Sequence, residues 1–332
     1  MITRYLGKDN FQVSALGLGC MGMSFAYGGA EESHAISTIH TAVDLGVTFL
    51  DTAEVYGPFD NEALIGKAIK GIRNKVQIAT KFGFRILPTG KGLERMAGVD
   101  SRPEHIRKSV EGSLKRLNID TIDLLYQHRI DPTVPIEDVV GTMAELIKEG
   151  KIRHIGLSEV SADTLRRACK VHPITAVQTE YSLWTREPEE SIIGACREMG
   201  VGFVPYSPLG RGFLTGKIKD HSGFSDDDFR RSLPRFQNEA MNKNQNLLNQ
   251  MQNISDKYGC TLAQLALAWV MNKGDDIVPI PGARKIEHLQ DNVGAVNLNI
   301  ADDDIKYLNN IFNPGSVYGL RYNQGDFNLI DK

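Results

Sequence analysis

The stretch "IDLLYQHRIDPTVPIEDVVGTMAELIKEGKIRHIGLS" (residues 122–158) contains a strand, a helix and a second strand in succession. Residues 122–128 and 154–158 are short, largely apolar runs, as strands buried on both faces are. Residues 135–150 between them are amphipathic, with a proline at the start and a glycine at the end. The stretch therefore predicts two parallel strands joined by a helical crossover.

Similar apolar runs, each bounded by turn residues, recur along the whole chain. They are residues 14–19, 47–51, 76–81, 122–128, 154–158, 174–179, 202–207 and 276–282. Amphipathic stretches at 31–46 and 102–118 predict further helices between them. Most runs start about 20 to 45 residues apart, the length of a βαβ unit. Eight such units predict one α/β domain over residues 1–332, a (β/α)8 TIM barrel.

Three additions to the barrel are expected. They are an N-terminal β-hairpin, a long loop after the seventh strand and extra C-terminal helices. The polar segment 219–245 predicts a large surface loop, a candidate lid. The tail from Asn313 has aromatic residues but no periodicity, so it either closes over the barrel mouth or is partly disordered.

A doubly wound Rossmann fold is the rival architecture. The first strand leads into "GLGCMG" (17–22), whose glycines lack the G-x-G-x-x-G spacing, and the chain continues "MSFAYGG" (23–29) without starting a helix. The sequence therefore favours the barrel.

Composition excludes several classes of partner. The net charge is −3 and the 38 basic residues are spread along the 332-residue chain, so no nucleic-acid partner is expected. No apolar window approaches the roughly 18 residues of a membrane span, and the N-terminus does not resemble a signal peptide. Four cysteines without a CxxC pair fit a reducing compartment, and we expect a cytoplasmic protein.

Polar side chains follow three neighbouring strands of the expected barrel. Asp51 ends the second strand, Lys81 the third and His128 the fourth, with Tyr56 on the loop after Asp51. Each alone could be a cap, a solvated lysine, a packed histidine or an amphipathic aromatic. Because the carboxyl ends of barrel strands meet at one rim, we expect the four to lie together.

This combination suits the reduction of a carbonyl group. A lysine ammonium beside a tyrosine lowers the tyrosine pKa from roughly 10 and makes the hydroxyl a usable proton donor. Asp51 would keep Lys81 charged, and His128 would hydrogen-bond a carbonyl oxygen. Glu54 has no partner that the sequence identifies, and we expect it to be a solvated loop carboxylate.

The motifs "FLDTAEVYG" (49–57), "IATKFG" (78–83) and "LLYQHR" (124–129) resemble those of the aldo-keto reductase superfamily. The resemblance runs from "LGLGCMGM" (16–23) to "PIPGARKIEHLQDN" (279–292). It implies a (β/α) barrel that reduces aldehydes and ketones with NADPH. It also implies that Tyr56 donates the proton, Lys81 lowers its pKa, Asp51 holds Lys81 and His128 positions the carbonyl.

Three other segments resemble most the branch with auxin-induced plant reductases and perakine reductase. They are "GLSE" (156–159), "YSPLGRG" (206–212) and "DDDFRRSLPRFQ" (226–237).

The resemblance also implies where the cofactor lies. Ser158, Glu159 and Gln178 would hydrogen-bond the nicotinamide carboxamide, although asparagine is the commoner residue at Glu159. Tyr206 would stack on the nicotinamide ring. The full implied set is Gly19, Met21, Asp51, Ser158, Glu159, Gln178, Tyr206, Ser207, Leu209, Gly210, Arg211, Gly282, Ala283, Arg284, Lys285, His288, Asp291 and Asn292.

The turn after the eighth run favours NADP over NAD. Arg284 and Lys285 precede a helix whose exposed N–H groups and dipole make an anion site, and two basic side chains suit an extra phosphate. In the family, arginine is frequent at the position of His288, and glutamate or glutamine at that of Asp291. The 2′-phosphate would therefore depend more on Arg284 and Lys285.

We expect the substrates to be aldehydes or ketones and cannot narrow this class further from the sequence. No metal ion is expected at the site. The candidate pocket residues are Met23, Tyr27, Phe82, Arg129, Trp184 and either Tyr318 or Tyr322. Two other functions stay open at this point. One is a cofactor-sensing subunit of the potassium-channel β-subunit type. The other is a barrel isomerase or aldolase with a Schiff base on Lys81, which leaves the basic turn at 284–285 unexplained.

Overall fold

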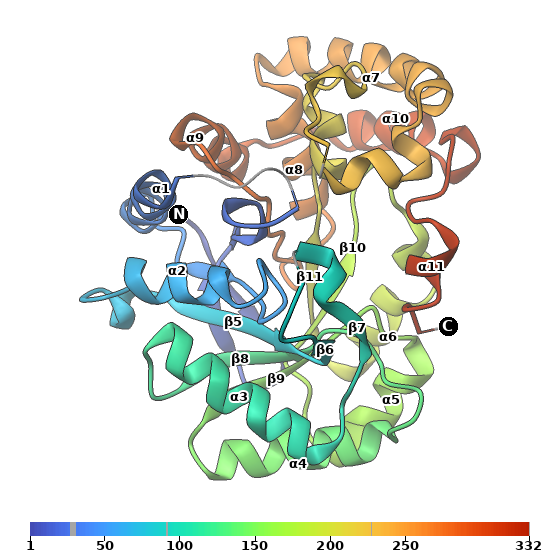
Figure 1. The fold of residues 1–332 in the computed structure, drawn as a ribbon. Helices are drawn as coiled ribbons and strands as arrows, with labels where there is room; N and C mark the ends of the chain where they lie inside the picture. The colour runs from blue at the N-terminus through green and yellow to red at the C-terminus, as the bar shows by residue number, and fades with distance from the viewer. Residues whose placement is uncertain (27–30, 91, 227, 332) are drawn as a thin grey trace.

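The computed structural model describes residues 1–26, 31–90, 92–226 and 228–331 of the chain. Parallel strands form a barrel, and most of the helices surround it (Figure 1). The strands are β1 (Thr3–Leu6), β2 (Phe11–Ser14), β3 (Leu18–Gly19), β4 (Phe49–Asp51), β5 (Gln77–Phe82), β6 (Phe84–Ile86), β7 (Met96–Val99), β8 (Ile122–Gln127), β9 (Ile152–Ser158), β10 (Ala176–Glu180) and β11 (Gly202–Tyr206).

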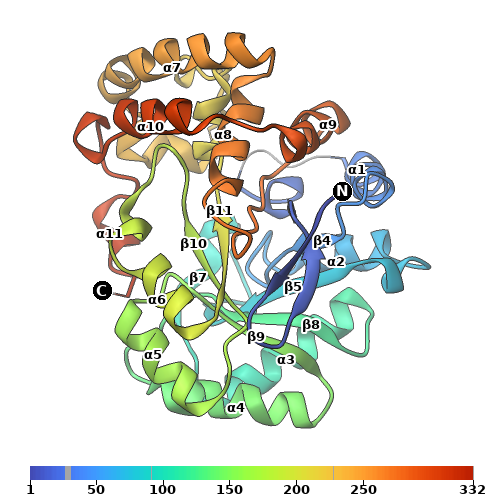
Figure 2. The same cartoon turned by 180° about the vertical axis from the view of Figure 1, so that it is seen from behind.

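The helices that alternate with the barrel strands cover its outside (Figures 1 and 2). They are α1 (Glu32–Asp44), α2 (Asp60–Ala68), α3 (Pro103–Leu117), α4 (Ile136–Lys148), α5 (Ala162–Val171) and α6 (Ile192–Met199). The helices predicted at 31–46, 102–118 and 135–150 are confirmed to within a few residues. None of the helices in the described ranges has the length and apolarity that a membrane span requires.

The barrel is a parallel sheet of seven strands in the order β11-β10-β9-β8-β5-β4-β3. The predicted barrel is confirmed, but segment 276–282 does not form the eighth strand. It closes the sheet through isolated bridges, Phe203 to Ile277, Tyr206 to Ile280 and Gly19 to Gly282. Toward β11 the segment keeps its backbone hydrogen bonds, from Val278 N to Phe203 O and from Ile280 N to Pro205 O. Pro279 and Pro281 have no N–H to donate, so on the β3 side they only accept, from Gly17 N and Gly19 N.

The predicted N-terminal hairpin is also confirmed, as β1 pairs with β2 antiparallel. Its apolar side chains Leu6, Phe11 and Val13 join the core inside the barrel. The hairpin lies at the amino ends of the strands, where Asp9 Oδ2 accepts a hydrogen bond of 2.8 Å from Thr175 just before β10. It therefore blocks the end of the barrel opposite the carboxyl rim.

The C-terminal part adds helices beyond the barrel, as predicted, and α7 and α10 lie together at one end of the molecule (Figure 2). The helices of this part are α7 (Asn238–Tyr258), α8 (Leu262–Met271), α9 (Ile286–Gly294), α10 (Asp302–Ile311) and α11 (Gln324–Phe327). Among them, α9 packs against both α1 and α8 and so belongs to the ring of helices around the barrel. The surface loop expected at 219–245 is shorter and more packed than its composition suggested. Helix α7 begins at Asn238, and Leu233 and Phe236 are buried.

The loop after β4 holds a second departure from expectation. Glu54 is not a solvated carboxylate, because it is only 4% exposed. Gly83 N donates to its Oε1 at 3.3 Å, and burial, followed by the nearby carboxylate of Glu62, raises the Glu54 pKa to about 8. Glu62 is itself buried and accepts from Arg116 Nε at 2.7 Å. The sequence hides this cluster because Glu62 and Arg116 lie on different helices.

The raised Glu54 pKa predicts a pH-dependent stability. Between the unfolded pKa of about 4.5 and the folded value of about 8, the folded chain binds more protons than the unfolded chain. Its stability therefore falls as pH rises through this window. Glu54→Gln removes this dependence, so the stability difference in favour of the variant should grow by roughly 2 to 4 kcal/mol from pH 5 to pH 8.

Thermal unfolding of both proteins at several pH values measures this difference. Glu104→Gln, at an exposed glutamate of α3, is the control and should give a difference that does not change with pH. A constant difference for Glu54→Gln would show that Glu54 stays ionised in the fold.

Candidate functional site

Four side chains meet at the carboxyl rim of the barrel, as the strand ends predicted. Asp51 ends β4 and Lys81 lies near the end of β5, the strand paired with β4. Lys81 Nζ donates to Asp51 Oδ1 at 2.5 Å, to Thr52 O at 2.8 Å and to Tyr56 OH at 3.2 Å. His128 follows β8, and its ring lies edge-on to that of Tyr56 with centroids 5.9 Å apart.

The Lys81 ammonium is fully buried, yet it is surrounded by oxygen atoms. Burial alone would lower the pKa of Lys81, but the charges of Asp51 and Tyr56 and their hydrogen bonds reverse this and raise it. Lys81 is therefore a permanent cation beside the Tyr56 hydroxyl. Gln178 Nε2 donates to the second oxygen of Asp51 at 2.7 Å, so both oxygens of this carboxylate are bound.

Tyr56 and His128 are both uncharged in this arrangement. Burial raises the pKa of Tyr56, and the opposing effect of Lys81 offsets only part of that rise. This corrects the expectation of a net lowering, which considered the lysine but not the burial. Burial, together with Arg129 and Lys81, lowers the pKa of His128 well below its ordinary value. Its Nδ1 is buried without a hydrogen-bond partner among the described residues.

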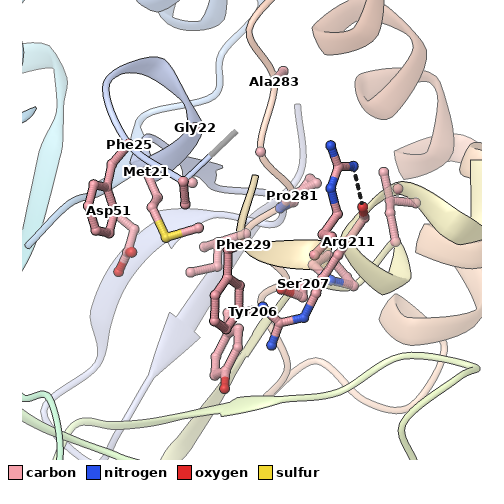
Figure 3. Close-up of a pocket in the computed structure, with 18 of the residues that line it drawn as sticks. Met21, Gly22, Phe25, Asp51, Tyr206, Ser207, Arg211, Phe229, Pro281 and Ala283 are labelled. Carbon is pink, nitrogen blue, oxygen red and sulfur yellow. Dashed lines mark hydrogen bonds between the residues drawn. The ribbon is translucent and has the colours of Figure 1, made fainter. Parts of the chain in front are cut away.

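These side chains open into a cavity of about 520 Å³. Figure 3 shows Met21 and Asp51 on one side of it, and Tyr206 and Arg211 on the other. The predicted residues that line it are Gly19, Met21, Asp51, Tyr56, His128, Arg129, Ser158, Gln178, Tyr206, Ser207, Leu209, Arg211, Gly282, Ala283, Arg284, His288, Asp291, Asn292 and Tyr322. Among the predicted cofactor residues, Glu159, Gly210 and Lys285 are not part of this lining.

Glu159 differs most from the expectation that it would hydrogen-bond the nicotinamide carboxamide. Its two carboxylate oxygens accept from Arg321 at 3.0 and 2.8 Å, and one also accepts from Tyr206 OH at 2.7 Å. A carboxylate bound in this way has little capacity left for a carboxamide. Ser158 and Gln178 do line the cavity nearby.

The segment after β11 turns sharply along the cavity wall. Ser207, Gly210, Arg211 and Gly212 have positive φ values of 49°, 55°, 55° and 97°. Such a backbone presents N–H groups rather than side chains to its surroundings. The Arg211 guanidinium is bound to Glu180 Oε2 at 2.7 Å, so its charge is largely neutralised within the protein.

The residues before and within α9 form another part of the wall, next to the end of β11, where Tyr206 is bridged to Ile280. Gly282 and Ala283 lead to the start of the helix, where Arg284 and His288 line the cavity while Lys285 does not. Burial, followed by the charges of Lys217 and Lys285, lowers the pKa of His288. Asp291 accepts from Thr261 Oγ1 at 2.9 Å.

Apolar side chains surround the part of the cavity next to Tyr56. They include Met21, Phe25, Val55, Phe84, Met96 and Leu329. Arg129 also lies there and donates to His128 O at 2.7 Å and to Ser158 Oγ at 3.3 Å.

Most other substrate candidates lie elsewhere. Phe82 and Trp184 belong to the main core, where Trp184 stacks on Phe213 at 4.1 Å between centroids, and neither lines the cavity. Met23 is buried in the same core, and Tyr318 is 49% exposed. Tyr27 lies outside the described residues.

Several cavity residues were not identified from the sequence. Phe25 comes after β3, Phe229 and Arg230 come from the packed segment before α7, and Asp326 comes from α11. The aromatic residues of the polar segment were the available signal for Phe229, since a solvated loop does not need them.

Comparison with known proteins agrees with this geometry. The model of the Aldo/keto reductase family matches residues 15–313. The protein called "Probable aldo-keto reductase 1" of Glycine max is 48% identical over 322 residues, which are 96% of this chain and 91% of that protein.

Two solved structures are similar over nearly the whole chain. The glycerol dehydrogenase AKR11B4 of Gluconobacter oxydans has a TM-score of 0.86 at 29% identity and covers 96% of this chain and 97% of its own. The aldo-keto reductase AKR11C1 of Bacillus halodurans, in its holo form, has a TM-score of 0.78 at 27% identity, with 98% and 99% covered. The chain belongs to the aldo/keto reductase family.

Proposed function

We propose that the protein reduces aldehydes and ketones to alcohols with NADPH, and that Tyr56 donates the proton. The observation that carries this proposal is the position of the Tyr56 hydroxyl, 3.2 Å from the buried Lys81 ammonium and on the wall of the cavity. His128 and an apolar wall lie on the same side, which suits a carbonyl group on an otherwise apolar substrate.

The shape of the cavity fits a dinucleotide. A Cβ at Gly19 would lie 2.8 Å from Ile280 O, so glycine lets β3 pack closely against segment 276–282 in the cavity wall. The backbone of residues 207–212 and the start of α9 suit phosphates, and Tyr206 offers a ring for stacking. When bound, NADPH supplies the hydride that the carbonyl carbon accepts.

Side chains of the protein then stabilise and neutralise the negative charge that develops on the carbonyl oxygen. Because burial raises the pKa of Tyr56, the hydroxyl keeps its proton until an alkoxide, a stronger base, develops beside it. The proton moves from Tyr56 to that oxygen, and Lys81 stabilises the resulting phenolate. His128 is neutral and donates a ring N–H to the same oxygen, so it orients the carbonyl without adding charge.

The surroundings of Lys81 argue against Schiff-base chemistry. A lysine nucleophile needs a free, deprotonated amine. Here the Lys81 ammonium donates to three oxygen atoms, and its pKa is raised rather than lowered.

We predict that Tyr56→Phe lowers kcat by roughly 10²- to 10⁴-fold, the range that one positioned acid contributes. NADPH binding should change little, since the ring is retained. NADPH absorbance with 4-nitrobenzaldehyde measures turnover, and quenching of protein fluorescence measures binding. Tyr307→Phe, at an exposed tyrosine on α10, is the control and should retain wild-type activity.

Full turnover by Tyr56→Phe would show that another group donates the proton. Tight NADPH binding by the wild type without turnover of any carbonyl compound would instead favour a cofactor-sensing role.

The basic turn before α9 predicts a preference for NADPH. Because Lys285 does not line the cavity and the pKa of His288 is lowered, Arg284, just before α9, is the cation proposed to meet the 2′-phosphate. Arg284→Ala should weaken NADPH binding about tenfold, in the range of a charge-assisted hydrogen bond, and change NADH binding little. Fluorescence titration with both cofactors measures this.

Arg153→Ala, at an exposed arginine at the start of β9, is the matched control and should affect neither cofactor. An equal loss of affinity for NADPH and NADH would place Arg284 away from the 2′-phosphate.

A further inference from the structure

The C-terminal tail reaches the cofactor side of the cavity. It continues from α10 past α11 to the C-terminus along the side of the barrel (Figure 1). At its start, Tyr318 exchanges two backbone hydrogen bonds of 2.9 Å with the buried side chain of Asn244 on α7. At its end, Asp331 Oδ2 accepts from Ser161 N and Oγ at 2.9 and 2.8 Å. The tail is therefore anchored on both sides of Arg321 and Tyr322.

Arg321 binds the carboxylate of Glu159 with two parallel hydrogen bonds, of 3.0 and 2.8 Å. The two side chains are only 8% and 1% exposed. Burial alone would raise the pKa of Glu159, but the charge and hydrogen bonds of Arg321 lower it to about 2. Glu159 is therefore a buried carboxylate whose counter-ion comes from a residue 162 positions further along the chain.

The same carboxylate holds the ring that faces the cavity. Tyr206 OH donates to Glu159 Oε1 at 2.7 Å and lies 2.7 Å from Tyr322 OH. Tyr206 and Tyr322 line the cavity, whereas Glu159 does not. The orientation of the Tyr206 ring thus depends on a carboxylate and a tyrosine that lie beside or within the tail.

Glu180 is a second buried carboxylate beside Arg321. Glu180 Oε2 accepts from Arg211 Nη2 at 2.7 Å and lies 3.8 Å from Arg321 Nη1. Carboxylates and arginines alternate from Glu159 through Arg321 and Glu180 to Arg211. Removing Arg321 would leave Glu159 buried beside Glu180 without an ion-pair partner, with only the charge of Arg129 to compensate it.

We propose that Arg321 is a positioning residue for the nicotinamide end of the cofactor site. It fixes Glu159, and Glu159 fixes the hydroxyl of Tyr206, so the tail sets the plane of the ring on which the nicotinamide stacks. This inference rests on the proposed function, which makes a nicotinamide the ligand of Tyr206. Contacts to the carboxamide then fall to Ser158 and Gln178, which line the cavity.

Arg321→Met tests the proposal, with the full-length protein and NADPH as the probe. The variant should bind NADPH at least tenfold more weakly and should lose part of the fluorescence change of the bound nicotinamide, because Tyr206 is no longer held. Asn244→Ala is the matched control, since it releases the same tail at a point that does not touch Glu159. It should bind NADPH as the wild type does.

The double variant Glu159→Asn/Arg321→Met separates positioning from simple packing. It removes both charges together and places at position 159 an amide that can both donate and accept. We expect it to regain most of the affinity that Arg321→Met loses. Arg321→Lys keeps the charge without the two parallel hydrogen bonds and should lie between the wild type and Arg321→Met.

Equal affinity losses in Arg321→Met and Asn244→Ala, or no recovery in the double variant, would reduce Arg321 to a tail anchor and overturn the proposal. If Arg321→Met does not fold, Arg321→Lys against Asn244→Ala makes the same comparison. Wild-type protein that binds no NADPH would contradict the proposed function itself, which is a different outcome from normal binding by the Arg321 variants.

Discussion

The structure of the rim depends on the buried ion pair between Lys81 and Asp51. Removing two charges from water costs several kcal/mol each, and the cost is offset only when the charges are paired and their remaining hydrogen-bonding capacity is used. Here Thr52 O and Tyr56 OH accept the remaining hydrogen bonds of the Lys81 ammonium, and Gln178 donates a hydrogen bond to the second oxygen of Asp51. The pair therefore ties β4, β5 and β10 together at the point where the cavity begins.

This requirement also explains why the tyrosine stands where it does. An ammonium that could reach water would have no need of the Tyr56 hydroxyl as a third acceptor. In the buried site the hydroxyl satisfies the lysine, and the lysine in turn favours the phenolate. The same contact thus supports the fold and prepares the proposed proton transfer, and neither role can be removed alone.

Local patterns were enough to predict the barrel and its rim. Short apolar runs alternating with amphipathic helices place strand ends at one edge, so Asp51, Lys81 and His128 could be grouped without a structure. The eighth run is not a regular strand for a local reason as well, because the prolines at 279 and 281 leave two backbone donors missing from its hydrogen bonding. The prolines can be read from the sequence, but a strand prediction based on apolar runs takes no account of a missing backbone N–H.

The carboxylates could not be assigned because their partners are distant in sequence. Glu54 is buried beside Glu62, whose counter-ion Arg116 is on another helix, and Glu159 is held by Arg321 from the tail. Spacing carries no information on such pairs, since each depends on which elements the barrel brings together. The segment before α7 shows the same limit, since its polar composition concealed the buried Leu233 and Phe236.

The distribution of charge around the cavity follows from these distant pairs. Glu159 and Glu180 lie just behind the wall, and unpaired they would repel the phosphates of a dinucleotide. Arg321 and Arg211 neutralise them from the protein side. Arg129, in contrast, has no carboxylate within ion-pair distance in the described ranges, and it lines the cavity beside His128. Because the carboxylates are compensated internally, the cationic groups on the cavity wall remain effective toward an anionic cofactor.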